Sequence, residues 1–465
     1  MQIQFKYNRM NFSPVSSENH SAIPEIAVIL AGGKGTRLGE MAKNLPKPMI
    51  DIAGKPLLER QVEWLKEFGI KKVILLTGYM AQHIRDYFGD GSRWGLSVEI
   101  IEETEPLGTA GALKQLQGKI HKPFWVVYGD LVASLSLDKA AAFHANSKAF
   151  ATLVVHPNDH PYDSDLVDVD EANRILKFIT KPHAPGLIAR NLVNAAVYIL
   201  PPEVFEMIPE GFRGDLARDI FPEMVLKKNV MAFNSPEYLK DMGTPDRLKK
   251  VRDDWESGKV QRLRVSYPRP TVFLDRDGVI LQYVPDIHKS EDVKLREGAA
   301  DAIRKLNRAG YLVVVVTNQP MIAKGYLSEK DLHFIHAKME TLLGESGAWV
   351  ERIYYCPHHP EKGFPGERPE LKVDCDCRKP KTGMLKAASS EFNIDRPHSW
   401  MVGDTWRDVE CGKTFQLRTV GVTGGEGYPY KEAKAVEPEK ICSGLLEAVE
   451  YILAEGILPR KDLQL

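Results

Sequence analysis

The chain has 465 residues, about three times the length of a typical single domain, which predicts two or three domains. Apolar residues make up 43% of the sequence and charged residues 27%, a balance that allows well-packed globular cores. The 62 basic and 63 acidic residues nearly cancel, which argues against a nucleic-acid binder. No apolar run approaches the roughly 18 residues of a membrane span, so no membrane partner is expected.

The N-terminal residues and the cysteines bear on where the protein works. Residues 1–23 are polar and lack the apolar segment of a secretory signal, so we expect a loosely ordered, flexible arm. The five cysteines are too few for a disulfide framework, and three of them cluster with histidine. These features predict a cytoplasmic protein that binds a metal.

Short apolar strands alternate with amphipathic helices in the first half of the chain. Strands are expected at 26–30, 73–77 and 124–128, and helices over 56–68 and up to residue 88. This alternation is typical of an α/β domain with a mostly parallel sheet. Because the strands are continuously apolar, we expect them to be buried on both faces.

The alternation breaks in a polar, basic, proline-containing stretch and then starts again. Strands are predicted at 271–274 and 311–317, and helices over 298–309 and 328–343. The last of these helices opens with a Ser-x-x-Asp capping pattern. Two different α/β domains joined by a linker are therefore expected. The predicted divisions are the arm at 1–23, a first domain at 24–255, a linker at 256–269 and a second domain at 270–465.

A glycine-rich loop follows the first predicted strand and reads LAGGKGTRLGEMAKNLPKPMI from Leu30 to Ile50. Its glycines leave backbone N–H groups free to approach a polyphosphate. The loop is not a Walker A motif, because no Gly-Lys-Ser/Thr ends it, and Leu38 replaces the third glycine of a dinucleotide fingerprint. The candidate phosphate-binding residues are Leu30, Gly32, Gly33, Gly35, Thr36, Arg37 and Lys47.

This loop and several later motifs resemble the sugar-1-phosphate nucleotidyltransferases, whose Rossmann-like fold the resemblance implies. The other matching motifs are EPLGTAGAL at 105–113, the YGD that ends at Asp130, and DMGTPDRL at 241–248. The resemblance implies that a sugar-1-phosphate oxygen attacks the α-phosphorus of a nucleoside triphosphate and that pyrophosphate leaves. It implies charge balance by Arg37 and Lys47, Mg²⁺ binding by Asp130 and Asp241, and substrate contacts by Gly108, Lys181 and Asn194.

These motifs indicate the reaction more clearly than they indicate which nucleotide base and which sugar the first domain binds. The stretch Glu102-Glu103 lies two residues before PLG, in the region where the family carries a base-contacting side chain, and Glu103 is the candidate. Guanine presents two N–H donor groups on one edge, and a carboxylate can accept from both, so GTP is favoured. Thr180 and Ala196 stand where the family usually has Glu and Gly, which leaves the details of sugar binding open.

The second domain opens with two aspartates at the end of its first predicted strand. In TVFLDRDGVI, Asp275 and Asp277 lie two residues apart before a glycine turn. One carboxylate of such a pair can attack phosphorus while the other protonates the leaving oxygen. Later predicted strands end in Thr317-Asn318 and Gly403-Asp404, and Lys379 lies between them in CRKP.

Together these motifs resemble the haloacid-dehalogenase-like phosphatases over about residues 270–422. The resemblance implies that Asp275 is the nucleophile and forms an aspartyl-phosphate, and that Asp277 is the general acid and then the base. It implies phosphoryl contacts by Thr317 and Lys379 and further substrate contacts by Asn318 and Arg378. Mg²⁺ would be held by Asp275, Asp404 and the backbone carbonyl of Asp277.

Three cysteines and a histidine form a C-x-H…C-x-C pattern, namely Cys356, His358, Cys375 and Cys377. Three thiolates and one imidazole suit tetrahedral Zn²⁺. The alternative is that the thiols bind no metal and that the histidines lie near them by coincidence. Because Lys379 follows closely, zinc is expected to position a phosphate-binding loop rather than to catalyse.

The zinc pattern narrows the resemblance to the D-glycero-D-manno-heptose 1,7-bisphosphate 7-phosphatases. The supporting motifs are YYCPHHP, CDCRKPKTGML and MVGD, although histidinol-phosphate phosphatases share the zinc pattern. Pro320-Met321 replaces the Ser-Gly that usually follows TNQ in this family, so the substrate or anomer preference stays open.

The pairing of the two domains predicts consecutive reactions on one sugar. The phosphatase would convert a heptose 1,7-bisphosphate into the 1-phosphate, and the first domain resembles the guanylyltransferases that use such a product. The expected partners are small molecules, a nucleoside triphosphate and heptose phosphates, while the oligomeric state stays open. Two alternatives remain: a mannose-type or other sugar transferase fused to a different phosphatase, or a first domain that binds nucleotide sugars and regulates without turnover.

Overall fold

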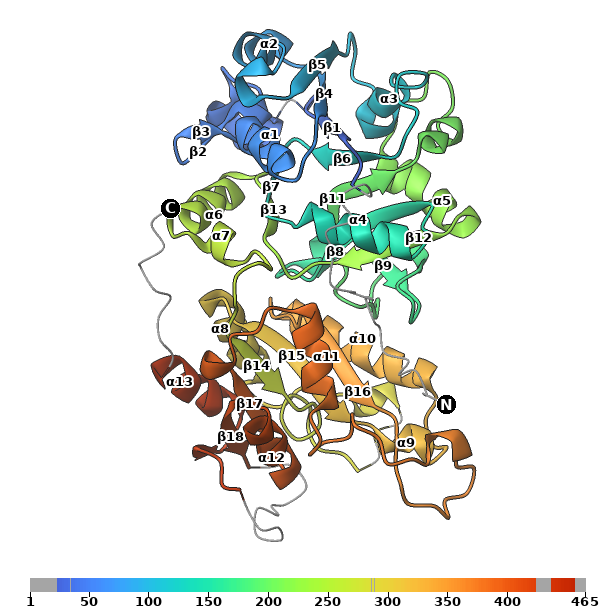
Figure 1. Cartoon of the computed structure of the whole chain (residues 1–465), viewed down its shortest axis with the longest axis vertical. Coiled ribbons are helices and arrows are strands. Elements are labelled where there is room, and N and C mark those ends of the chain that lie inside the picture. Colours follow the sequence, from blue (N-terminus) through green and yellow to red (C-terminus); the bar gives the residue numbers. More distant parts are fainter. Residues whose placement is uncertain (1–22, 34, 286, 288, 424–435, 456–465) are drawn as a thin grey trace. The chain divides into compact units, whose positions relative to one another are not determined.

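The computed structural model describes residues 23–33, 35–285, 287, 289–423 and 436–455, so nearly all of the predicted N-terminal arm lies outside the described residues. The described chain forms two compact units, each with its own sheet. Figure 1 shows their elements along the chain. The first unit contains residues 23–156, 165–181 and 192–264, and the second contains 157–164, 182–191 and 265–455.

The first unit is built on a sheet of nine strands, with the path β10-β9-β11-β6-β1-β4-β5 and with β8 joining β11 to β12. The predicted strands are confirmed, because β1, β4 and β6 lie where apolar runs were expected, with one end shifted by a residue. The strands are β1 Ile26–Leu30, β4 Lys72–Thr77, β5 Ser97–Glu102, β6 Phe124–Tyr128, β8 Ala151–His156, β9 Leu166–Val169, β10 Ile175–Ile179, β11 Val193–Leu200 and β12 Val230–Asn234.

The sheet is mixed, so the expectation of a mostly parallel sheet is wrong for this unit. β1, β4, β5 and β6 pair in parallel, whereas β9, β10 and β11 form antiparallel pairs, and β11 also runs antiparallel to β6 and β8. The physical reason is a tight turn, in which Asp170 and Arg174 share a backbone hydrogen bond and fold β10 back on β9.

Helices cover both faces of this sheet, which explains the continuously apolar strands. Alternate residues of β1 point to opposite faces, so Ala27 and Ile29 pack in one core and Val28 packs in the other. Helices α1, α2 and α4 contribute to the first core, and α3 and α5 contribute to the second. The helices are α1 Leu57–Glu67, α2 Ala81–Phe88, α3 Gly108–Lys114, α4 Leu137–Asn146 and α5 Phe221–Lys227.

Two small strand pairs and two further helices complete the first unit. β7 Leu131–Ala133 pairs with β13 Leu239–Asp241, and β2 Asp51–Ile52 pairs with β3 Lys55–Pro56. The long helix α6 Pro245–Glu256 is followed by the short α7 Lys259–Arg262. The segment expected to be a plain linker is therefore partly helical, because Val260 is buried against the core of this unit.

The second unit is a parallel sheet of six strands in the order β16-β15-β14-β17-β18-β19, as expected for this half of the chain. The three neighbouring strands β15, β14 and β17 end beside the residues to which the predicted phosphatase chemistry is assigned. The strands are β14 Thr271–Leu274, β15 Leu312–Asn318, β16 Arg352–Cys356, β17 Trp400–Gly403, β18 Arg418–Val422 and β19 Lys440–Cys442.

Helices again cover both faces of the sheet. Helices α8, α10 and α13 pack on the face that carries Val272 and Val313, while α11 contacts β16 and α12 contacts β17 and β18. The predicted capping box is confirmed, because Ser328 and Asp331 exchange both hydrogen bonds at the start of α10. The helices are α8 Ala299–Ala309, α9 Pro320–Ala323, α10 Glu329–Glu345, α11 Gly383–Glu391, α12 Trp406–Thr414 and α13 Leu445–Glu455.

In the described part of the chain, none of these helices combines the length and the apolar character needed to cross a membrane.

Candidate active sites

The first unit contains a cavity of about 750 Å³ at the carboxyl ends of β1, β4 and β6. This volume falls in the range of small-molecule sites, and its position is where open α/β sheets bind ligands. Two sections of chain that are distant in sequence form its walls, the glycine loop and the segment around Glu103. Its lining includes the predicted residues Leu30, Gly32, Gly33, Gly35, Thr36, Arg37, Lys47, Glu103, Gly108 and Asp130.

Glycine is required at one point beside each wall. Gly129 precedes Asp130, and a Cβ atom there would lie 2.9 Å from the carbonyl oxygen of Leu30. Gly108 has a φ of 72°, and a Cβ atom on it would lie 2.3 Å from the carbonyl oxygen of Gly214. A side chain at either position would collide with neighbouring backbone, so glycine is needed for the chain to pack this closely beside the cavity.

Cations and carboxylates gather at one end of the cavity. Lys47 is buried and forms an ion pair with Asp130. A Cβ atom at Gly243 would lie 2.7 Å from Asp241 Oδ1, 3.3 Å from Arg37 Nη2 and 3.7 Å from Lys47 Nζ. The structure therefore brings together the four residues that the sequence assigns to phosphate and metal binding.

Arg247 is a fifth member of this group that the sequence interpretation did not single out. Its Nη1 donates to both carboxylate oxygens of Asp241, at 3.1 and 3.0 Å. Burial alone would raise the pKa of Asp241, but Arg247, the N–H of Gly243 and Lys47 outweigh it and lower the pKa. Three cations thus face two carboxylates, and the excess positive charge suits an anionic polyphosphate.

The other end of the cavity is acidic. Glu102 is ion-paired with Arg85 and Glu105 with Arg213, so their charges are balanced. Glu103 instead accepts a hydrogen bond of 3.3 Å from the N–H of Leu107, and partial burial raises its pKa. The cavity lining thus combines a cationic group, which includes Arg37 and Lys47, with the acidic stretch 102–105.

Lys181 and Asn194 do not line this cavity, although the structure brings them together. Asp165 accepts from the N–H of Lys181 through its side chain at 3.0 Å and from the N–H of Asn194 through its carbonyl at 2.9 Å. The side-chain amide of Asn194 donates to the hydroxyl of Tyr198, whose ring lies 6.0 Å from that of Tyr128 in the cavity wall.

The second unit gathers carboxylates around one buried lysine. Nζ of Lys379 lies 2.9 Å from Asp275 Oδ2 and 2.6 Å from Asp408 Oδ1, and it donates to the carbonyl of Val316 at 2.8 Å. The carboxylates of Asp275, Asp404 and Asp408 all have oxygens within 4.8 Å of one another. Three strands, β14, β15 and β17, thus deliver their ends to one point.

This cluster has more negative than positive charge. Burial raises the pKa of Asp275 against the opposing effect of Lys379, and burial together with Asp275 and Asp408 raises the pKa of Asp404. Burial would lower the pKa of Lys379, but Asp275 and Asp408 raise it, so the lysine stays protonated. One lysine cannot balance three buried carboxylates, and the oxygen ligands left over are the kind that Mg²⁺ prefers.

Asp277 belongs to a separate buried hydrogen-bond chain beside this cluster. Arg276, which is 1% exposed, donates to both oxygens of Asp277 at 2.9 and 2.8 Å, and its third nitrogen lies 3.2 Å from Nε2 of His336. Gln319 donates at 2.9 Å both to Asp277 and to the hydroxyl of Thr317. The carboxylate is therefore fixed in orientation before any substrate arrives.

Asn318 and Arg378 hold the loop that carries Lys379. The side chain of Asn318 donates to the carbonyl of Lys379 at 3.1 Å and accepts from its N–H at 3.0 Å. Arg378 donates to the carbonyl of His358 at 3.3 Å. These contacts connect the lysine to the neighbouring cluster of sulfur ligands.

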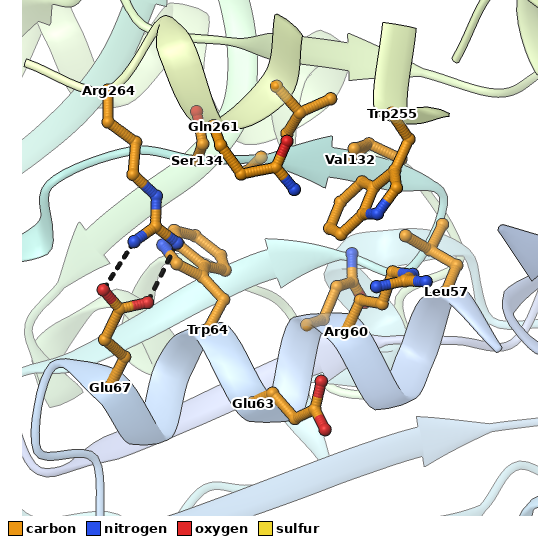
Figure 2. A pocket seen from close by; sticks show the side chains of 13 residues that line it. Leu57, Arg60, Glu63, Trp64, Glu67, Val132, Ser134, Trp255, Gln261 and Arg264 are labelled. Carbon is orange, nitrogen blue, oxygen red and sulfur yellow. Dashed lines mark hydrogen bonds and ion pairs between the residues drawn. The ribbon is translucent and has the colours of Figure 1, made fainter. Parts of the chain in front are cut away.

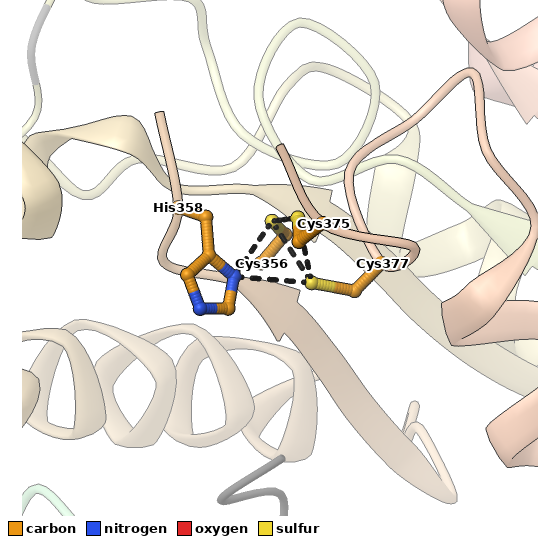
Figure 3. A group of neighbouring side chains, drawn as sticks. All are labelled: Cys356, His358, Cys375 and Cys377. Carbon is orange, nitrogen blue, oxygen red and sulfur yellow. Dashed lines mark hydrogen bonds between the residues drawn. The ribbon is translucent and has the colours of Figure 1, made fainter. Parts of the chain in front are cut away.

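The four predicted zinc ligands, Cys356, His358, Cys375 and Cys377, converge in space (Figure 3). Distances between neighbouring ligand atoms, measured at Sγ and at Nδ1 of His358, run from 3.2 to 3.7 Å. The edge of a tetrahedron around zinc with Zn–S bonds of 2.3 Å is about 3.8 Å, so the four atoms need to move apart only slightly to hold the ion. His359 lies outside this group.

Comparison with known proteins identifies both halves. The family model described as nucleotidyl transferase matches residues 26–258, half of the chain. The chain belongs to the nucleotidyl transferase family. A second model, described as HAD-hydrolase-like, matches residues 376–448, so the protein carries a nucleotidyltransferase domain followed by a phosphatase domain.

Individual relatives match one domain each. The mannose-1-phosphate guanylyltransferase of Mycobacterium tuberculosis is 32% identical over 249 residues, which is 53% of this chain and 67% of that protein. The D-glycero-beta-D-manno-heptose-1,7-bisphosphate 7-phosphatase of Haemophilus influenzae is 44% identical over 142 residues, 30% of this chain and 74% of that protein. The crystal structure of HddC from Yersinia pseudotuberculosis is 29% identical, covers 50% of this chain and 100% of its own, and has a TM-score of 0.44. The chain spans between 59% and 67% of the length of the guanylyltransferases that it matches.

Three residues to which the sequence interpretation gave no role support the two sites, namely Arg247, Asp408 and Gln319. Arg247 lies within the DMGTPDRL motif, six residues after Asp241, on the first turn of α6. Asp408 lies shortly after the strand that ends in Gly403-Asp404, and its carboxylate both pairs with Lys379 and caps α12 through Thr405. Gln319 ends the TNQ motif, but the motif does not indicate its contact with Asp277, which comes from a distant segment.

Proposed function

We propose that the protein is a bifunctional enzyme of nucleotide-activated heptose synthesis. The phosphatase domain removes the 7-phosphate of D-glycero-D-manno-heptose 1,7-bisphosphate, and the transferase domain joins a nucleotidyl group, preferentially GMP, to the heptose 1-phosphate. The observation that carries the proposal is that one chain holds both a charged cavity of nucleotide size and a buried lysine–carboxylate cluster next to a positioned acid.

In the phosphatase step, an oxygen of Asp275 attacks phosphorus while the bond from phosphorus to the sugar oxygen breaks. Asp277 gives its proton to that leaving oxygen and then takes a proton from the water that cleaves the aspartyl-phosphate, which releases inorganic phosphate. Lys379 and Thr317 offer donors to the phosphoryl oxygens. Support comes from the paired hydrogen bonds of Arg276 to Asp277, which hold this carboxylate in place.

In the transferase step, the phosphate of the sugar is already ionised and needs no general base. A sugar-phosphate oxygen attacks the α-phosphorus of the triphosphate, and the bond to the β,γ-diphosphate breaks. Arg37 and Lys47 at the cationic end neutralise the charge on the phosphates. Lys181 binds the sugar phosphate, and Asn194 binds a sugar hydroxyl. Because neither side chain lines the cavity of about 750 Å³, this role requires both side chains to approach that cavity, whose wall includes Tyr128.

Two kinds of metal ion fit the donor sets. Asp130 and Asp241 in the first unit, and Asp275 and Asp404 with the carbonyl of Asp277 in the second, offer the hard oxygen ligands of Mg²⁺. When bound, Mg²⁺ lowers the repulsion between phosphate and carboxylate or between phosphate and phosphate. Zn²⁺ fits the sulfur cluster and would stabilise the loop that ends at Lys379.

The choice of heptose over mannose rests on the phosphatase domain. The heptose bisphosphate phosphatase relative is 44% identical, whereas the mannose-1-phosphate guanylyltransferase relative is 32% identical over the other domain. A phosphatase that leaves a 1-phosphate makes the acceptor that its fused transferase needs. The second candidate is a mannose-type guanylyltransferase fused to a phosphatase for another sugar phosphate, which the guanylyltransferase relatives favour.

The proposal predicts two independent activities that single substitutions separate. With both anomers of heptose 1,7-bisphosphate and GTP, ³¹P NMR should show release of inorganic phosphate followed by pyrophosphate.

Asp275→Asn should abolish phosphate release but leave pyrophosphate release from heptose 1-phosphate. Lys47→Ala should abolish pyrophosphate release but leave phosphate release, because the two clusters belong to separate cores. Faster turnover of mannose 1-phosphate or histidinol phosphate would reject the heptose assignment, and full transferase activity in Lys47→Ala would reject the site.

Glu103 is predicted to select guanine. Glu103→Gln removes one of the two acceptors for the base edge and should lower kcat/KM for GTP about 10- to 100-fold, with little change for UTP. Glu102→Gln is the matched control, since that carboxylate is already paired with Arg85, and it should change the ratio of GTP to UTP use only slightly. A wild-type preference for UTP or dTTP, or an unchanged ratio in Glu103→Gln, would contradict this role.

The sulfur cluster is predicted to hold one zinc ion per chain. Cys377→Ser should lose this zinc, measured by plasma mass spectrometry, and the phosphatase domain should unfold several degrees lower, because the loop loses its metal constraint. Cys411→Ser, a buried thiol outside the cluster, is the control and should keep its zinc. Equal zinc contents in the two variants would rule out the assignment.

A further inference from the structure

Each unit contains an arginine that holds a carboxylate through two hydrogen bonds, but in different settings. In the first unit, Arg264 donates to Glu67 of α1 at 2.5 and 2.9 Å, and the glutamate side chain is 47% exposed (Figure 2). In the second unit, Arg276 donates to Asp277 at 2.9 and 2.8 Å, and the arginine is 1% exposed. The first pair joins two segments at the surface, whereas the second holds the proposed acid of the phosphatase.

The hydrogen bonds to Asp277 are shared unequally between its two carboxylate oxygens. Among the described residues, Oδ1 accepts one bond, from Nε of Arg276 at 2.9 Å. Oδ2 accepts two bonds, from Nη2 of Arg276 at 2.8 Å and from Nε2 of Gln319 at 2.9 Å. Because a carboxylate oxygen has two lone pairs, Oδ2 is fully used and Oδ1 keeps one lone pair for a proton.

The backbone of Arg276 fixes the other aspartate of the site. Its N–H donates to Asp275 Oδ1 at 2.7 Å, and its carbonyl accepts from the N–H groups of Ile280 and Leu281, both at 2.9 Å. These bonds close the turn that follows the two aspartates. One residue therefore orients the proposed nucleophile through its backbone and the proposed acid through its side chain.

The third nitrogen of the Arg276 guanidinium contacts His336 of α10. Nη1 lies 3.2 Å from Nε2 of the imidazole, and because arginine can only donate, Nε2 is the acceptor and the ring proton is on Nδ1. His336 is 4% exposed, and burial together with the charge of Arg276 lowers its pKa well below the usual value. The neutral imidazole thus anchors the guanidinium at the nitrogen that does not touch Asp277.

These contacts specify which atom delivers the proton in the proposed phosphatase reaction. A sugar alkoxide is a strong base, so the leaving oxygen needs a proton as its bond to phosphorus breaks. We infer that Oδ1 of Asp277 carries this proton. Arg276, Gln319 and His336 are positioning residues, because they occupy Oδ2 and hold the carboxylate in one orientation. As the bond from Asp275 to phosphorus forms, the proton moves from Oδ1 to the sugar oxygen; the inference rests on the proposed phosphatase function and deepens it.

Two phosphate esters separate this positioning role from a role in folding. The sugar oxygen of heptose 1,7-bisphosphate needs a proton to leave, whereas 4-nitrophenolate is a weak base and leaves without one. In the full chain with Mg²⁺, His336→Leu removes the acceptor for Arg276 and should lower kcat/KM for the bisphosphate about 10- to 100-fold. The same variant should change kcat/KM for 4-nitrophenyl phosphate less than about threefold, and His336→Gln, which keeps an acceptor, should restore most of the loss.

A second variant and two controls test the same contacts. Arg276→Lys keeps the buried charge but cannot make the two parallel bonds, so it should show the same selective loss. Arg264→Lys breaks the corresponding pair of the first unit and should leave both phosphatase activities unchanged. His333→Leu, at a residue whose ring packs against Tyr355 as that of His336 does, controls for the packing of α10 and should leave the ratio of the two activities unchanged.

A double-mutant cycle tests whether His336 acts through Asp277. In an Asp277→Asn background, His336→Leu should cause no further loss on the bisphosphate, because the acid is already absent. A full further loss in that background would overturn the inference. Equal losses on both esters in His336→Leu and Arg276→Lys, or no loss on either, would overturn it as well.

Failure of the proposed function gives a different result. A wild type that prefers another sugar phosphate rejects only the heptose assignment, and that ester then replaces the bisphosphate in the comparison. A wild type that cleaves 4-nitrophenyl phosphate but no sugar phosphate would reject the proposed phosphatase function and, with it, the acid role of Asp277.

Discussion

Pairing of carboxylates with fixed cations beside the ends of strands is the constraint on which both halves of this protein depend. In the second unit, Lys379 lies between Asp275 and Asp408 and leaves Asp404 without a cation. In the first unit, Lys47 pairs with Asp130, and Arg247 pairs with Asp241. A charge held in a poorly solvated place is stable only when it is paired, so the sequence around each lysine has to supply a fixed geometry.

The two units meet this constraint on different sheets and with opposite charge balance. Each places its charged groups at the carboxyl ends of parallel strands, where loops can reach a ligand without breaking the sheet. The first unit has an excess of cations, which suits the large charge of a nucleoside triphosphate. The second has an excess of carboxylates, which suits a nucleophile and a metal ion acting on one phosphoryl group. The charge balance beside the strand ends thus distinguishes the two sites, each of which stands on its own sheet.

Much of this could be predicted from local patterns. Continuous apolar runs located β1, β6, β14 and β15. Three further patterns indicated residues that the structure brings together: the glycine loop, the two aspartates of TVFLDRDGVI and the cysteine spacing. Local patterns failed where distant segments decide the outcome. The antiparallel strands β9 to β11 depend on a hairpin and on pairing with β6, and the partner of Asp241 depends on where α6 begins.

The proposal that both carboxylate clusters bind a divalent cation when substrate is present can be tested in one crystal. Crystals grown with Mn²⁺ and a non-hydrolysable GTP analogue would be measured by anomalous diffraction at the manganese edge. The account predicts one peak between Asp275 and Asp404 and another that bridges Asp130, Asp241 and the triphosphate. Peaks at neither position, with lysine and arginine alone contacting the carboxylates, would contradict it.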